Sequence, residues 1–290
     1  MAADSFVQRF LLENLDIRGV VVHLGEAWQS LQEDRGYAPA VRQLLGEMTA
    51  ITTILGGQLK QDGRLTFQLR GEGAVRMLVM DCEQAPGSLR LRGMARAEAG
   101  IAPAPLPQLL GNGQLLMSLD LPEAKVPFQS IVPLQGDSVA AVFEHYLMQS
   151  EQQPSRLFLA ADEHAAAGLF LQKLPGADAR DADGWQRIQI LAETVRPEEL
   201  LGLPAETLLT RLFQEEDVRL FAAAPVVHYC PEDWDKVRAT LRALGRAEVE
   251  SILAEHGVIV VQDEICNREY HFDADDVARL FDPKGNGSMH

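Results

Sequence analysis

The sequence predicts an α+β fold: an N-terminal domain built on a mixed or antiparallel sheet with packed helices, then a helical linker, then a small C-terminal α+β module. Three observations lead to this prediction. Before residue 175, several short strand-like segments follow one another without helices between them, which favours antiparallel pairing. Apolar residues then recur at helical spacing, and after residue 225 two helical segments precede a pair of short strands.

Two helices are expected near the N-terminus. Over residues 5–15, the apolar side chains Phe6, Phe10 and Leu11 share one helical face. A longer helix is expected to begin at Pro39, because proline suits the first helical position. Its buried stripe follows at intervals of three and four residues and consists of Val41, Leu44, Leu45, Met48, Ile51 and Leu55.

The apolar period then changes to two, which indicates strands. Leu65, Phe67 and Leu69 alternate with polar side chains. Asp137 or Ser138 is expected to cap a further helix, because short polar side chains can accept the free amides of a first helical turn. Other strands are expected at residues 76–80, 89–94, 115–119, 128–132, 157–160 and 169–172.

Changes in composition divide the chain into four predicted parts. A small, polar and acidic stretch over residues 175–184 separates the first domain from the linker. The second helical stripe of the linker begins near Pro204 and contains Leu208, Leu209, Leu212 and Phe213. The predicted parts are a domain at 1–175, a helical linker at 176–224, a module at 225–282 and a flexible tail at 283–290.

The C-terminal module is expected to contain three helices and one hairpin. The first two helices are predicted over residues 232–244 and 247–256. Residues 258–261 and 269–272 are expected to pair as a hairpin. Asp273 is expected to cap the last helix.

The composition excludes several classes of protein. With 26 lysines and arginines against 42 aspartates and glutamates, the formal net charge is -16, which argues against binding to nucleic acid or to anionic membranes. Apolar residues make up 47% of the chain, so a buried core is expected. The first residues lack a basic segment followed by a long apolar run, and we expect a cytoplasmic protein. Three cysteines are too few for a disulfide framework.

The sequence contains no motif of a common catalytic class. It has neither the GxSxG of serine hydrolases nor the HExxH of zinc proteases, so no catalytic residue is predicted and the protein is not expected to be an enzyme. The glycines at 71–73 and 111–113 lie between strand-like segments and do not continue as phosphate-binding loops, so no nucleotide cofactor is expected. Cys82 follows an apolar strand, where a buried, inert thiol is expected.

The C-terminal module carries side chains that can ligate zinc. His228 lies two positions before Cys230, and Asp263 lies three positions before Cys266. Imidazole, thiolate and carboxylate are all zinc ligands, and pairs at turns and strand ends are typical of zinc modules. The alternative is a zinc-free module in which Asp263 is a turn residue. Its core would consist of Trp234, Val237, Leu241, Ile252, Leu253, Val260, Tyr270 and Phe272.

A series of short motifs runs through the chain. They are Arg9-Phe10, Glu13-Asn14, Ile17-Arg18-Gly19, Leu59-Lys60, Asp62-Gly63, Arg92-Gly93-Met94-Ala95-Arg96, Gly111-Asn112-Gly113, Gln135-Gly136-Asp137, Ser150-Glu151-Gln152, and residues 200–204 and 249–255. In their order and spacing they resemble the redox-regulated bacterial holdase chaperones, the heat-shock proteins of 33 kDa. The resemblance extends over nearly the whole length of the chain.

This resemblance implies an ATP-independent chaperone that captures unfolding proteins during stress. In the family, four cysteines of the C-terminal domain bind one zinc ion. Oxidation pairs these cysteines in disulfides and releases the zinc, after which the zinc domain and the linker unfold and a dimeric, apolar client-binding surface is exposed. The candidates for that surface here are Leu208, Leu209, Leu212 and Phe213, which are expected to be core residues while the linker is closed.

The chain departs from the family at the zinc ligands. His228 and Asp263 stand where the first cysteine of each pair is expected, so neither disulfide of the family can form. One disulfide within the module is left, between Cys230 and Cys266, and the chain-entropy estimate assigns it about 4 kcal/mol. One zinc ion, bound more weakly than by four cysteines, is compatible with the ligands that remain. We therefore expect a holdase that is homodimeric when active and has an altered or lost redox switch.

Two other functions stay open from the sequence. A structural or adaptor protein would keep the fold without chaperone activity, and an aggregation assay separates it from a holdase. A zinc- or thiol-dependent hydrolase would use His228 and Cys230, with Glu264 as the general base. Loss of hydrolysis in Glu264→Gln would support this second alternative.

Overall fold

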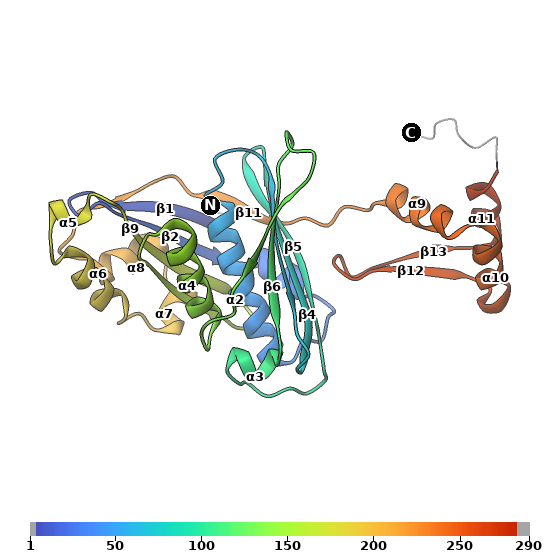
Figure 1. Ribbon diagram of the computed structural model, residues 1–290, viewed down its shortest axis with the longest axis horizontal. Helices are drawn as coiled ribbons and strands as arrows, with labels where there is room; N and C mark the ends of the chain where they lie inside the picture. Colours follow the sequence, from blue (N-terminus) through green and yellow to red (C-terminus); the bar gives the residue numbers. More distant parts are fainter. Residues whose placement is uncertain (1–3, 283–290) are drawn as a thin grey trace. The chain divides into compact units, whose positions relative to one another are not determined.

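A computed structural model of the chain describes residues 4–282 (Figure 1). The chain divides into two compact units, Met1–Tyr229 and Cys230–His290, and each unit is described by itself. The flexible tail predicted at 283–290 lies outside the described residues.

The first unit is built on one large mixed sheet. Its strands are β1 (Ser5–Leu12), β2 (Ile17–Leu24), β3 (Arg64–Arg70), β4 (Val75–Ala85), β5 (Ser88–Ala97), β6 (Gln114–Asp120), β7 (Phe128–Val132), β8 (Ser155–Ala161), β9 (Ala166–Lys173), β10 (Val218–Leu220) and β11 (Ala224–His228). Neighbouring strands follow the order β7-β6-β3-β4-β5-β11-β1-β2-β9-β8, and β10 pairs with β1. Within this sheet β11 and β5 are parallel, and the other pairs are antiparallel.

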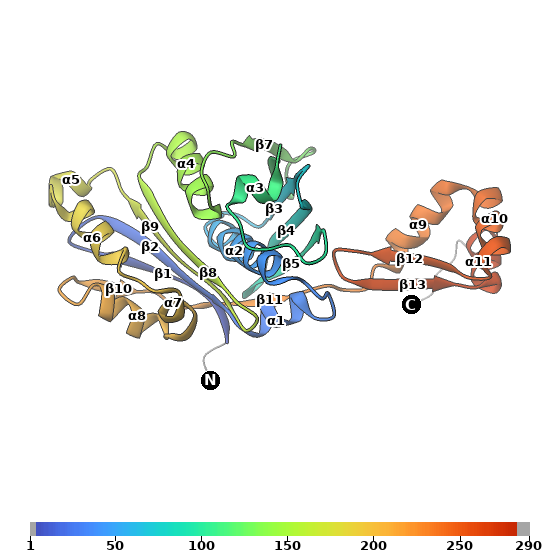
Figure 2. The same cartoon turned by 90° about the horizontal axis from the view of Figure 1, so that it is seen from below.

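Helices cover both faces of one half of this sheet. The helices of the first unit are α1 (Glu26–Gln32), α2 (Pro39–Gly56), α3 (Leu106–Leu110), α4 (Val139–Glu151), α5 (Ala177–Arg180), α6 (Gly184–Ala192), α7 (Pro197–Gly202) and α8 (Ala205–Leu212). Helix α2 lies on one face of β2 and β9, and α6, α7 and α8 lie on the other (Figure 2). Successive residues of β2 therefore enter different cores: Val20 and Val22 pack with α2, whereas Val21 packs with the linker helices.

The other half of the sheet has one apolar face and one polar face. Phe67 and the alternate residues Leu65 and Leu69 of β3 belong to the core that contains α2, as the alternation predicted. On the opposite face, Thr66 donates a hydrogen bond of 2.6 Å to the Asp81 carboxylate, which also pairs with Arg92 at 2.9 Å. The predicted α+β class is confirmed.

The helix predicted over residues 5–15 is wrong, because this segment forms the central strand β1. It pairs with β2, β10 and β11. Both faces of β1 are covered: Val7 packs in the core that contains α2, and Phe10 packs in the second core, which contains α6, α7 and α8. A strand that is buried on both faces lacks the polar alternation that distinguishes it from a short helix.

Other local expectations hold. The helix expected at Pro39 is α2, which begins at that residue. The side chain of Ser138 caps α4 by accepting the amide of Ala141 at 3.2 Å.

The module expected to begin at residue 225 begins instead at Cys230, because Ala224–His228 is strand β11 in the sheet of the first unit.

The second unit has its own small core. It contains α9 (Trp234–Leu244), α10 (Arg246–His256), the paired strands β12 (Ile259–Asp263) and β13 (Arg268–Phe272), and α11 (Ala274–Leu280). The predicted hairpin is confirmed, and Asp273 caps α11 by accepting the amide of Asp276 at 2.8 Å. Val260 was expected in the core but is 47% exposed, because it alternates along β12 with the buried Ile259.

Candidate redox site and linker surface

The candidate redox site lies at the beginning of the second unit. The structure joins Cys230 and Cys266 in a disulfide, with 5.5 Å between their Cα atoms and 36 positions between them in the sequence. Cys266 lies in the turn between β12 and β13. The Asp263 carboxylate shapes this turn, because its Oδ1 accepts the amides of Ile265 at 3.1 Å and of Cys266 at 3.2 Å.

Three further contacts connect the segment after Cys230 to the hairpin. The amide of Asp233 donates to the hydroxyl of Tyr270 at 2.9 Å. The Trp234 ring packs edge-on against the Tyr270 ring, with 4.8 Å between the centroids. Arg268 pairs with Glu232 at 3.7 Å. The disulfide therefore covalently closes a loop whose ends already pack on each other.

His228 belongs to the first unit, whereas the other three predicted zinc ligands belong to the second. It is the last residue of β11, opposite Leu91 of β5. Among the described residues, its buried Nε2 has no hydrogen-bond partner. Burial lowers the pKa of His228 below its usual range, and the positive charge of Arg35 lowers it further.

The residues present do not fit zinc in this disulfide-bonded form. Within residues 4–282, no group of three or more histidine, cysteine, aspartate or glutamate side chains is placed to hold a metal ion. Cys230 and Cys266 share a disulfide, and zinc binds cysteine as the thiolate. The Oδ1 of Asp263 accepts two amides of the turn.

The candidate client-binding stripe on α8 is buried in this structure. Leu208, Leu209, Leu212 and Phe213 are exposed by 0%, 2%, 5% and 1%. They belong to the second core of the first unit, which we call the linker core. Its strand side contains Phe10, Leu12, Ile17, Val21, Leu169 and Leu171. A linker that detached would expose apolar surface on both the helices and the strands.

Ion pairs add polar contacts to the linker helices. The buried Glu199 carboxylate of α7 pairs with Arg196 at 2.8 Å and also contacts Arg211 of α8. Hydrogen bonding to Arg196 lowers the pKa of Glu199. Arg187 of α6 pairs with Glu216 at 2.8 Å and with Asp181 at 3.0 Å. The sequence analysis predicted none of these ion pairs. The spacing of three residues between Arg196 and Glu199 was the one local signal, and it concerned that pair alone.

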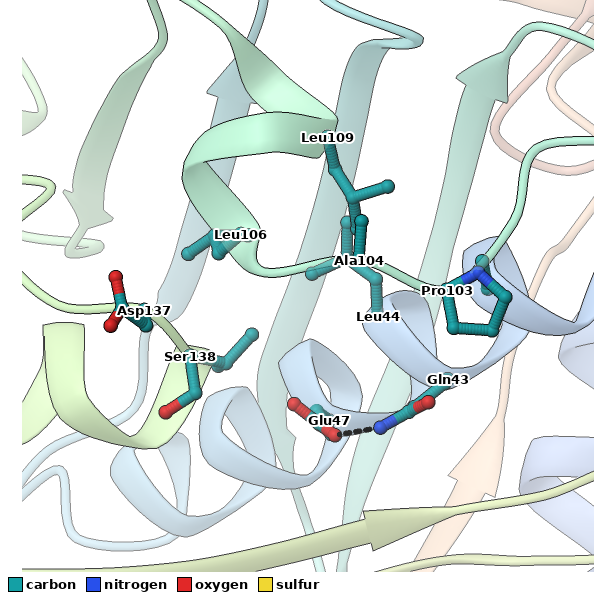
Figure 3. A pocket seen from close by; sticks show the side chains of 11 residues that line it. Gln43, Leu44, Glu47, Pro103, Ala104, Leu106, Leu109, Asp137 and Ser138 are labelled. Atoms are coloured by element: carbon teal, nitrogen blue, oxygen red, sulfur yellow. Dashed lines mark hydrogen bonds between the residues drawn. The ribbon is translucent and has the colours of Figure 1, made fainter.

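A small cavity lies between α2, α3 and the start of α4 (Figure 3). Its volume is about 110 Å³, below the roughly 300 Å³ at which small-molecule pockets begin. Its one buried carboxyl, Glu47, accepts a hydrogen bond of 3.0 Å from Gln43 (Figure 3). Burial raises the pKa of Glu47. The cavity is too small for a substrate of ordinary size.

The thiols are not placed for nucleophilic chemistry in this form. Cys82 is buried, and burial together with the negative charges of Asp81 and Glu83 raises its pKa to about 12. Cys230, which the hydrolase alternative requires, is in the disulfide. The expectation of a buried Cys82 is confirmed.

The fold recurs in a solved structure. The crystal structure of a 33 kDa chaperonin from Thermotoga maritima, also titled heat shock protein 33 homolog, matches with a TM-score of 0.81. The match covers 96% of this chain and 97% of that chain, at 20% sequence identity. At this identity the similarity shows the fold. No helix within residues 4–282 is long and apolar enough to cross a bilayer.

Similar sequences extend over almost the whole chain. A 33 kDa chaperonin of Methylobacillus flagellatus is 39% identical over 283 residues, covering 97% of this chain and 96% of that protein. A 33 kDa chaperonin of Nitrosococcus oceani is 42% identical over 275 residues, covering 95% and 93%. The fold and these relatives place the protein in the class of α+β heat-shock proteins that the motifs indicated. The chain belongs to the Hsp33 protein family, whose model matches residues 5–273.

Proposed function

We propose that the protein is an ATP-independent holdase, which binds unfolding proteins and prevents their aggregation, and that it has no enzymatic activity. The observation that carries this proposal is the linker core, in which the α8 stripe covers an apolar strand face. Opening the linker would expose both surfaces to a client without hydrolysis of a nucleotide. Membership in a chaperone family and the names of the relatives support the same function.

We propose that the redox switch is altered in its direction. The disulfide between Cys230 and Cys266 closes a loop within the second unit, and such a cross-link destabilises the unfolded chain. Oxidation would therefore stabilise this unit, and reduction would loosen it. The resemblance implies the opposite for four-cysteine relatives, in which oxidation precedes unfolding.

We also propose that the reduced protein binds zinc. Reduction would free two thiolates, and Asp263 and His228 remain the further candidates. Metal analysis of protein that was reduced anaerobically and exposed to Zn²⁺ tests this directly. A metal content near zero, with a folded second unit, would contradict zinc binding.

The family resemblance also supports a cytoplasmic location and a homodimer as the active form. Sedimentation of the disulfide-bonded and the reduced protein, each with and without a client, tests the second of these. A client complex that contains one copy of the chain would contradict it.

The main experiment is light scattering by a thermally unfolding client at equimolar chaperone. Disulfide-bonded, reduced and heat-treated protein are compared, together with Cys230→Ser and with Cys82→Ala as a matched control. We expect reductant to increase client capture by the wild type and by Cys82→Ala. Cys230→Ser should capture clients without reductant and should not respond to it.

Two outcomes would overturn parts of this proposal. If no form of the protein reduces aggregation, the chain is a structural or adaptor member of the family. If capture is strongest in the disulfide-bonded form, the holdase function stands and the proposed direction of the switch is wrong.

A further inference from the structure

His23 connects the sheet of the first unit to a linker helix. It lies on β2, opposite Phe6 of β1, and its ring stacks against the Phe6 ring with 6.0 Å between the centroids. Its Nε2 lies 2.8 Å from the carbonyl oxygen of Leu201 in α7, and its Nδ1 lies 3.1 Å from the carbonyl oxygen of Asp4. The two ring nitrogens therefore join α7 to the segment before β1.

The chemistry of these two partners determines how many protons the ring can use. A carbonyl oxygen only accepts hydrogen bonds, and a neutral imidazole has one N–H to donate. In the neutral ring, one nitrogen lone pair faces a carbonyl lone pair. The imidazolium has an N–H on each nitrogen, so it donates to Leu201 and Asp4 at the same time.

Charged groups on the surrounding elements are few at this end of the strands. Those on the elements that pack around the ring are Asp4, Arg9 on β1, Arg18 on β2, Glu26 on α1, Lys173 on β9, and Glu198 and Glu199 on α7. Lys173 pairs in register with Ile17, and Arg18 with Gln172, at the far end from His23. The Asp4 carboxylate accepts the Glu26 amide at 2.9 Å. Glu199 is paired with Arg196 and Arg211.

We propose that His23 is a proton-dependent latch for the linker. When the ring takes up a proton from solvent, it gains a second charge-assisted hydrogen bond and holds α7 more tightly to the sheet. When the proton is released, one of the two bonds is lost and α7 opens more often. The docking of α7 therefore depends on whether the His23 ring carries one proton or two.

The test is amide hydrogen exchange of the full chain at pH 6 and pH 8, corrected for the intrinsic exchange rate. We expect the protection of the amides of α7 to fall on the order of tenfold from pH 6 to pH 8, the effect of losing one charge-assisted bond. In His23→Gln, whose side chain stays neutral, protection should be the same at both pH values. His164→Gln is the matched control, because the His164 side chain is 77% exposed, and it should behave as the wild type.

Wild-type protection that does not change between pH 6 and pH 8 would overturn the latch. So would a His23→Gln protein with the same pH dependence as the wild type. If the variant does not fold, ¹⁵N spectra of the wild-type histidine rings decide, and a His23 ring that is neutral at both pH values contradicts the proposal. Consequences for client capture rest on the proposed function, but exchange at α7 is measured without a client, so the two can fail separately.

Discussion

Two cysteines set the redox chemistry of the second unit. Cys230 and Cys266 are the two cysteines of this unit, so inside it they can pair only with each other, and in the structure they do so. The sequence made this pair the one candidate disulfide of the unit, because few thiols are present, but left open whether the bond forms. It was not sufficient to place His228, whose strand partners on β5 lie far away in the sequence.

Removal of the disulfide is expected to destabilise the second unit. In Cys230→Ser, the free energy of unfolding of α9–α11 should fall by about 4 kcal/mol, the chain-entropy value for a loop of this length. Amide exchange of these helices with and without reductant measures the change. Cys82→Ala should keep the response of the wild type, since Cys82 is a free thiol in the first unit. An equal response in Cys230→Ser and the wild type would contradict the prediction.

Glu199 is expected to make linker docking sensitive to strong acid. Its folded-state pKa is lowered, so its stabilising contribution is complete above its unfolded pKa and is lost as the pH falls through the lower folded value. Glu199→Gln should lower the urea midpoint of the linker core at neutral pH and reduce the additional loss in acid. Fluorescence of Trp185, which packs at this core, reports the transition.

Glu198→Gln is the control for that experiment, because Glu198 is the exposed neighbour on the same helix. Equal shifts in the two variants would show that total charge, and not the Glu199 ion pairs, is responsible.

At the scale of elements, sequence reasoning succeeded where the signal is local. Alternation located β3, Pro39 marked the first residue of α2, and Asp273 marked the cap of α11. It failed at β1 and overlooked β2, both of which have covered faces on each side. In such strands the apolar residues do not alternate with polar ones, so periodicity carries little information.

The α8 stripe is expected to control when the linker opens. Leu208→Ala should cost about 2–5 kcal/mol, because the residue is fully buried and the substitution leaves a cavity. The linker core should therefore open, and client capture begin, at a lower temperature than in the wild type. Light scattering over a temperature series measures this effect. Thr210→Ala, on the exposed face of α8, should leave that temperature unchanged.

For the whole molecule, the boundary between the units is the main correction. Strand β11 follows the linker in sequence but lies between β5 and β1, and it contributes the buried Val226 to the core of the first unit. The composition of residues 224–228 does not show this, because the strand's neighbours come from the first hundred residues.

This topology predicts how shortened chains behave. A chain ending at Tyr229 is expected to keep the stability of the first unit. A chain ending at Ala223 loses β11, which removes about 2 kcal/mol of apolar burial at Val226 alone and leaves two strand edges unpaired. Thermal unfolding of the two proteins compares them, and equal midpoints would show that β11 does not stabilise the sheet.

The amino-acid sequence was enough to predict the α+β class, the family, and most of the elements with polar alternation or capping residues. Each of these depends on spacing within one segment or on residue identity. For the cysteines it supplied only the candidate pair. It was not enough for the buried strands, the position of β11 and of its last residue His228 in the sheet, or the contacts of Glu199 and His23. Each of these depends on residues brought together by sheet pairing and by burial of two apolar faces. Such contacts have no signature within a single stretch of chain.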